Sequence, residues 1–219
     1  GNSFVDMRPY NFNGKDFTDV HSLVYELATN WKNGKKELFR GYLAPHFANS
    51  SNQKCARICD DAEEEARKGI KSEDLIFFET LYKIDPKLKT FHWKGKSFKN
   101  LQEFGNYMFE KLSEGDMTDY DFYQSVLTDK ILTKFVELRL TNDVKLKNAA
   151  NNIEKLKAVW TDASYDAYNY AYDAKDFWQN QLTAQSSVSA SAGYYVRALD
   201  DFFLYNLYAK QIRSRVIGY

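Results

Sequence analysis

The segment Tyr10-Asn-Phe12-Asn-Gly14-Lys15-Asp-Phe17 returns 81 residues later as Phe91-His-Trp93-Lys-Gly95-Lys96-Ser-Phe98. The aromatic positions match one for one, and the glycine and the lysine after it are identical in both copies. Glycine adopts a positive φ without steric cost, so each copy predicts two very short strands, or an extended arm, that turn at Asn13-Gly14 and Lys94-Gly95. An internal duplication is therefore expected to organise the chain.

The residues after each copy keep the same offset. Apolar positions recur every three or four residues, as on one face of an amphipathic helix. They are Val20, Leu23, Leu27 and Trp31 after the first copy, and Leu101, Phe104, Met108 and Leu112 after the second. Thr18 or Asp19, and Lys99-Asn100, are candidate N-caps, and each helix is expected to stop at Gly34 and Gly115.

The remaining apolar patterns predict further helices. They cover residues 38–47, 54–68, 74–84, 120–140 (as two helices), 144–159, 164–180 and 194–215. The fold class predicted is all-α, or nearly so: a tandem repeat of a short hairpin followed by helices, packed as one helical body.

The duplication also predicts the domain organisation. Residues 1–9 form an N-terminal tail, 10–88 the first repeat unit and 89–180 the second. Residues 181–192, rich in Ser, Ala and Gln, are interpreted as a linker. Residues 193–219 are either a degenerate third repeat or a capping helix that closes the stack.

The composition is that of a globular protein without a charge bias. Apolar residues make up 44% of the 219 positions, and 30 basic residues balance 30 acidic ones. Such a balance gives no field that favours nucleic acid or an anionic membrane surface. The sequence also lacks an apolar run of about 18 residues, so we expect no nucleic-acid partner and no membrane insertion in this segment.

Two cysteines are too few for a disulfide framework, which favours a reducing compartment, and we predict a cytoplasmic location. The chain begins at Gly1 without Met, and the alternative is a piece excised from a membrane-anchored protein. The oligomeric state stays open at this point.

The cysteines and histidines form no recognisable chemical motif. Cys55 and Cys59 are one helical turn apart and could supply half of a metal site, but thiols in that spacing are more often buried in a core. His21, His46 and His92 are scattered along the chain. His92 falls where the first copy has asparagine, which argues against a catalytic base.

The acidic run 60–65 could attract a hard cation, but it is interpreted as a solvated face at a helix start, where it suits the helix macrodipole. The sequence contains no phosphate loop, nucleophile elbow or zinc-protease motif. We therefore expect no metal site, no cofactor and no catalytic residue, and we lean away from an enzyme without excluding one.

The best candidate for a binding surface lies further along the chain. A helix over 164–180 would place Tyr165, Tyr168 and Tyr172 on one face, while Tyr170 and Phe177 lie on another, so not every ring can reach the same core. Exposed tyrosine and tryptophan rings are favoured where one protein contacts another. We name Tyr165, Tyr168, Tyr172 and Trp178 as candidate binding residues; the alternative is that these rings pack between repeats.

The motif Trp93-Lys-Gly95-Lys96-Ser-Phe98-Lys-Asn-Leu101-Gln-Glu-Phe104 and its recurrence resemble uncharacterised helical repeat regions of bacterial multidomain proteins. Some of those proteins carry Ser/Thr protein-kinase-like or zinc-ribbon domains. The likeness covers mainly residues 10–34 and 91–135. It implies an accessory, non-catalytic region and assigns no functional residue.

Three functions remain open. The first is a non-catalytic protein-interaction or regulatory module of a larger bacterial protein, which binds a protein or peptide between the repeats. The second is a small-ligand sensor or enzyme whose cleft lies between the two units, lined by acids such as Asp60, Asp61 or Glu64. The third is a structural spacer without a specific ligand.

Overall fold

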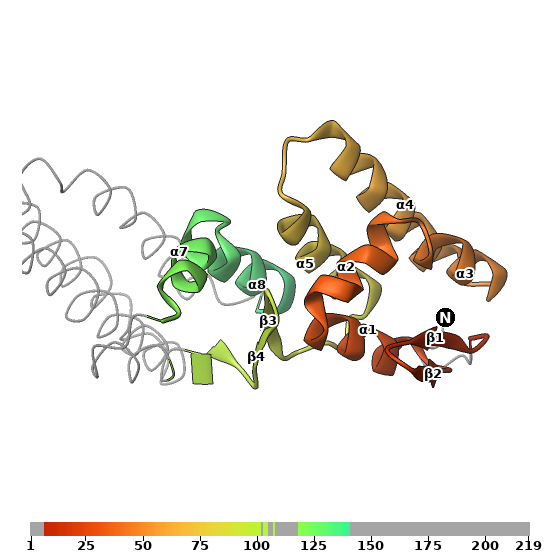
Figure 1. The fold of residues 1–219 in the computed structure, drawn as a ribbon, viewed down its shortest axis with the longest axis horizontal. Coiled ribbons are helices and arrows are strands. Elements are labelled where there is room, and N and C mark those ends of the chain that lie inside the picture. Colours follow the sequence, from red (N-terminus) through yellow and green to blue (C-terminus); the bar gives the residue numbers. More distant parts are fainter. Residues whose placement is uncertain (1–6, 102, 105–106, 108–117, 141–219) are drawn as a thin grey trace, which may run out of the picture. The chain divides into compact units, whose positions relative to one another are not determined.

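The computed structural model describes residues 7–101, 103–104, 107 and 118–140 (Figure 1). The chain divides into two compact units, Gly1–Phe98 and Lys99–Tyr219. Within residues 7–98 a β-hairpin comes first, helices α1 to α5 follow, and a second β-hairpin ends the unit. In the second unit the described residues contain helices α7 and α8. The predicted helices over 144–159, 164–180 and 194–215 and the linker over 181–192 lie outside the described residues.

Both hairpins form where the aromatic segments predicted strands. β1 (Tyr10–Phe12) pairs antiparallel with β2 (Lys15–Phe17), and β3 (Phe91–Trp93) pairs antiparallel with β4 (Lys96–Phe98). The two turn residues of each hairpin have positive φ: 55° and 76° at Asn13-Gly14, and 48° and 88° at Lys94-Gly95. A positive φ at both central residues is the type I′ geometry that matches the twist of two-stranded hairpins.

The predicted all-α fold class is wrong. About 62% of the described residues are helical, and the two antiparallel hairpins make the fold a mixed α/β one. The type I′ turns are the physical reason, because they bring the aromatic segments into backbone pairing instead of leaving them as extended arms. The prediction of a tandem repeat packed as one body also fails, because the described residues show no repeated fold and the chain forms two units.

The helix predicted to end at Gly34 is instead two helices. α1 (Val20–Thr29) begins at Asp19, whose carboxylate accepts a hydrogen bond from the Ser22 N–H at 2.8 Å, and it ends at Asn30. α2 (Trp31–Phe39) follows at once and contains Gly34 in its interior. A Cβ at Gly34 would lie 2.4 Å from the Leu27 carbonyl oxygen. This glycine therefore permits close packing of α2 on α1 and does not stop a helix.

The next helices match their predicted ranges more closely. α3 (Leu43–Asn49) is followed by α4 (Gln53–Lys68) and α5 (Glu73–Ile84). Asn52 and Ser72 are the N-caps of α4 and α5, and Gly69, with a φ of 68°, ends α4. These are the residue types that favour helix ends, which explains the agreement.

The second hairpin belongs to the core of the first unit. Phe91 and Trp93 are fully buried. The Trp93 ring lies 5.6 Å from Trp31 of α2 and 5.8 Å from Phe78 of α5, in edge-to-face contacts. Since such aromatic pairs contribute beyond their buried area, β3 is a structural part of this unit.

The second unit begins with a capped helical turn. The Asn100 side chain accepts a hydrogen bond from the Glu103 N–H at 2.8 Å, and the Glu103 carboxylate accepts one from the Lys99 N–H at 2.6 Å. α7 (Tyr120–Thr128) and α8 (Ile131–Arg139) then occupy the range predicted for two helices. The Phe104 ring lies 6.4 Å from that of Phe122 in α7.

Candidate binding groove

Helices α3 and α4 form a helical hairpin with a defined turn. The N–H of Asn52 donates to the Phe47 carbonyl at 2.8 Å, and the N–H of Ser51 donates to the Ala48 carbonyl at 3.2 Å. Ser51 has a φ of 60°. This is a Schellman ending of α3, and it leads directly into the N-cap of α4. The turn fixes how the two helices face each other.

The residues on the facing sides of this hairpin differ in size. Leu43 and Phe47 of α3 and Cys55 and Cys59 of α4 are buried in the core. On the outer side α3 contributes only small residues, and an open groove of about 670 Å³ lies there. It is lined by Ala44, Pro45, Ala48, Gln53, Ala56, Arg57, Asp60 and Asp61. The alanines and the proline provide an apolar floor, and the α4 side chains provide a polar rim.

The rim charges have no partner within the described part of the chain. Arg57, Asp60 and Asp61 are exposed, and none of their side chains forms a hydrogen bond or an ion pair with another described residue. Elsewhere in the same unit exposed charges do pair, as Lys68 does with Glu65 at 3.7 Å. The groove therefore offers charges of both signs beside an apolar floor.

The acidic run does not start a helix, so that part of its interpretation is wrong, whereas Asp60, Asp61 and Glu64 are exposed, as expected of a solvated face. Asp60 to Glu65 occupy the middle and second half of α4, and the first turn of α4 contains no acidic residue. Burial raises the pKa of Glu63, repulsion from Asp60 adds to that rise, and Arg67 lowers the pKa. The run thus concentrates negative charge where the helix macrodipole does not favour it.

The two cysteines lie on the core side of the same helix. Cys55 and Cys59 are both buried and unpaired as thiols. Burial raises the pKa of both thiols; Asn52 and Lys54 partly offset this at Cys55, and Cys55 and Glu63 add to it at Cys59. A buried thiol held in its protonated form acts as a small apolar residue.

Each histidine has a separate structural contact. His21 Nδ1 lies 2.5 Å from Oδ2 of Asp85, a carboxylate that is 1% exposed, and this links α1 to the end of α5. His46 Nε2 lies 2.8 Å from the Arg8 carbonyl oxygen. Since the three rings have different partners, the described residues do not bring the histidines together at one site.

His92 is fully buried in β3. Its Nε2 lies 2.5 Å from Thr90 Oγ1 and its Nδ1 lies 2.7 Å from Ser97 Oγ, across the hairpin. Burial lowers the pKa of His92 to about 4, so the ring is neutral at pH 7. The equivalent pair in the first hairpin, Asn11 and Asp16, also joins its strands by a hydrogen bond, at 3.0 Å. The contact of His92 is therefore a cross-strand link.

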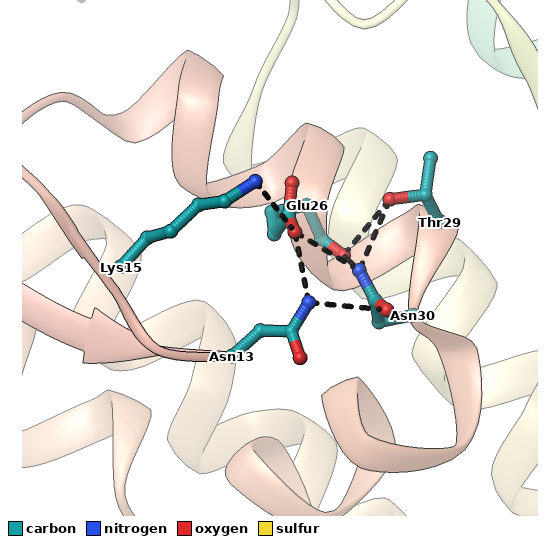
Figure 2. Close-up of polar contacts among 5 residues, drawn as sticks. All are labelled: Asn13, Lys15, Glu26, Thr29 and Asn30. Carbon is teal, nitrogen blue, oxygen red and sulfur yellow. Dashed lines mark hydrogen bonds and ion pairs between the residues drawn. The ribbon is translucent and has the colours of Figure 1, made fainter.

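Two further polar clusters hold the first unit together. Figure 2 shows the Glu26 cluster, in which the Asn13 and Asn30 amides donate to Glu26 Oε1 at 3.1 and 3.2 Å and Lys15 approaches at 3.8 Å. The Asn30 amide also donates to the Glu26 carbonyl at 3.1 Å (Figure 2). These contacts tie the turn of the first hairpin to the junction of α1 and α2.

The second cluster centres on Asp74 of α5. The Trp31 indole N–H and Lys35 reach Asp74 Oδ1 at 2.7 and 2.8 Å, and Lys94 lies 3.9 Å from Oδ2. Burial alone would raise the pKa of Asp74, but the hydrogen bonds from Lys35 and Trp31, with the nearby Lys94, lower it. Both clusters use their carboxylates in structural contacts, which leaves the groove as the candidate site.

The predicted tyrosine surface lies elsewhere in the chain. Tyr165, Tyr168, Tyr172 and Trp178 are outside the described residues, so they stay predictions. Asp60 and Asp61 are expected from the sequence only as acids of a cleft between units, and Arg57 and the small residues are not among the predicted site residues. The spacing of Ala44, Ala48 and Ala56 on two successive helices was the available signal.

Among residues 7–101, 103–104, 107 and 118–140, three or more potential metal ligands do not gather at any point. No described helix has the length and apolar character needed to cross a membrane. Searches with protein-family models, curated proteins and solved structures find no match for this chain.

Proposed function

We propose that this chain is a non-catalytic protein-interaction module that binds a segment of a protein in the α3–α4 groove. One observation carries the proposal: the groove combines a floor of small apolar residues with exposed charges that have no partner among the described residues. Docking sites commonly pair an apolar centre with a polar rim. The groove is also bounded by two helices, which suits the packing of a further helix.

The proposal extends to the context of the chain. The resemblance of the hairpin motif to helical repeat regions implies an accessory, regulatory part of a larger bacterial protein. The two free, buried thiols support a cytoplasmic location. The balanced charge of the chain supports a protein partner over nucleic acid.

The groove can be filled without touching the core. Ala48 lines the groove and is half-buried, so Ala48→Phe would place a ring over its floor. The neighbouring Asn49 is exposed and does not line the groove, so Asn49→Phe adds the same ring to α3 away from the site. The two variants form a matched pair.

The test is a quantitative affinity purification with the wild-type chain and both variants, read by mass spectrometry. We expect a partner to be recovered with wild type and Asn49→Phe, and at least tenfold less with Ala48→Phe. Circular dichroism must show the same helix content in all three. Equal recovery with both variants would place the binding surface elsewhere, and the tyrosines at 165, 168 and 172 would then be the next surface to test.

A further inference from the structure

The exposed face of α4 carries an ordered series of unpaired charges. Lys54, Arg57, Asp61 and Glu64 are all exposed. Within the described part of the chain none of their side chains takes part in a hydrogen bond or an ion pair. Their spacing of three, four and three residues places them along one side of the helix. That side faces away from Cys55, Cys59 and Ala62, which are buried, while the buried Ala56 forms part of the groove floor beside it.

The helix dipole does not account for this series. Of the four charges only Lys54 lies in a terminal turn of α4, while the last turn carries Arg67 and Lys68, which the dipole favours. The basic residues of the series come first and the acidic residues come later.

The series is self-complementary when a second α4 runs antiparallel beside it. With residue 59 at the centre, Lys54 comes opposite Glu64 and Arg57 comes opposite Asp61, and the same two pairs recur on the other side of the centre. We propose that the occupant of the groove is a second copy of this chain, which docks α4 against α4 about a two-fold axis. A two-fold dimer has such an interface, with one patch used twice.

The groove provides the room for this approach. Arg57 and Asp61 line it, and its floor consists of Ala44, Pro45, Ala48 and Ala56. Small residues let helices approach to the usual 8 to 10 Å between axes, roughly, without steric conflict. This inference rests on the proposed function, because it names the partner that the groove binds.

The pairs of this interface would be exposed at its edge. Exposed ion pairs are individually weak and are screened by salt. The dimer is therefore weak and sensitive to ionic strength, and we expect its dissociation constant to rise about tenfold between low and high salt.

Two charge-swap variants of the full chain test the pairing. Lys54→Glu/Arg57→Glu makes the whole series acidic, and Asp61→Lys/Glu64→Lys makes the whole series basic. Each swap places like charges at positions 57 and 61, four residues apart, which is a small cost for α4 that circular dichroism of both variants measures. Lys32→Glu/Lys36→Glu changes two exposed lysines of α2 by the same amount and serves as the control.

Sedimentation equilibrium measures the oligomeric state of wild type, the control and the swapped variants. We expect wild type and the control to dimerise, each swapped variant alone to be monomeric, and an equimolar mixture of the two swapped variants to form a heterodimer. Recovery in the mixture also shows that both variants are folded. The proposal is overturned if wild type stays monomeric at low salt, if a swapped variant dimerises like wild type, or if the mixture stays monomeric.

The purification with Ala48→Phe and Asn49→Phe separates this inference from the proposed function. If wild type is monomeric and recovers a different protein that Ala48→Phe fails to recover, the dimer is overturned and the interaction module stands. A monomeric chain with equal recovery in both variants would overturn both proposals.

Discussion

Gly34→Ala should destabilise the first unit, although replacing a glycine inside a helix with alanine usually has the opposite effect. Alanine usually stabilises a helix interior by about 1 kcal/mol relative to glycine. Here the new Cβ would lie 2.4 Å from the Leu27 carbonyl oxygen and 2.9 Å from Phe77 Cζ. Overpacking costs about 1 to 3 kcal/mol, and the upper figure applies because the nearest atom is backbone. The net loss is then about 2 kcal/mol after the helix gain is subtracted.

Native-state hydrogen exchange read by mass spectrometry measures this loss locally. Amides of α1 and α2 should open about thirtyfold more often in Gly34→Ala than in wild type, which is the factor that about 2 kcal/mol gives. Asn33→Ala is the matched control, because Asn33 is exposed on the same helix and should gain a few tenths of a kcal/mol, roughly. If Gly34→Ala slows exchange as the control does, the close approach of α2 to α1 is wrong.

Three further predictions concern groups that are buried or half-buried. Because burial lowers the pKa of His92 to about 4, the unfolded chain binds a proton between about pH 6.5 and 4 that the folded chain does not bind. As the pH falls through this window, the free energy of unfolding of wild type should decrease by about 1.4 kcal/mol per pH unit relative to His92→Gln, as measured by urea unfolding. Parallel pH profiles of the two chains would contradict this. Asp74→Asn should cost about 1 to 3 kcal/mol at pH 7, because it weakens the contacts with Trp31 and Lys35. Since the pKa of Asp74 is lowered, the carboxylate contribution is lost as the pH falls through the folded pKa, so the two chains should converge in acid. Cys55 and Cys59 should react with a disulfide reagent only when the unit opens, so urea should accelerate labelling, and fast labelling of the native chain would show that α4 does not bury them.

The local elements were the predictable part of the fold. Asn13-Gly14 and Lys94-Gly95 indicated the two turns, and Asp19 and Gly69 mark helix ends by residue type alone. These signals depend on the backbone of a few neighbouring residues, which is why the sequence contains them.

The predictions that were wrong concern features that depend on contacts between residues distant in the sequence. Gly34 carries the signal of a helix end, and only the closeness of Leu27 and Phe77 shows that it is a packing glycine. The burial of Trp93 against Trp31 likewise explains why β3 completes the first unit instead of starting a second copy. Sequence periodicity cannot distinguish these cases.

The groove falls between these two extremes. Its acids, Asp60 and Asp61, stand out in the sequence, but they lie at the middle of α4 and not at its start. The small residues that form the floor are unremarkable until α3 and α4 are brought together by the turn at Ser51 and Asn52.

Site-specific photo-crosslinking tests most directly whether the α3–α4 groove is the docking surface. A photoreactive phenylalanine in place of Gln53 lies on the groove rim without removing a charge, and the same residue in place of Lys32 reports on α2. We expect an adduct from position 53, with a second copy of the chain or another protein, and none from position 32. An adduct from position 32 with none from position 53 would contradict it.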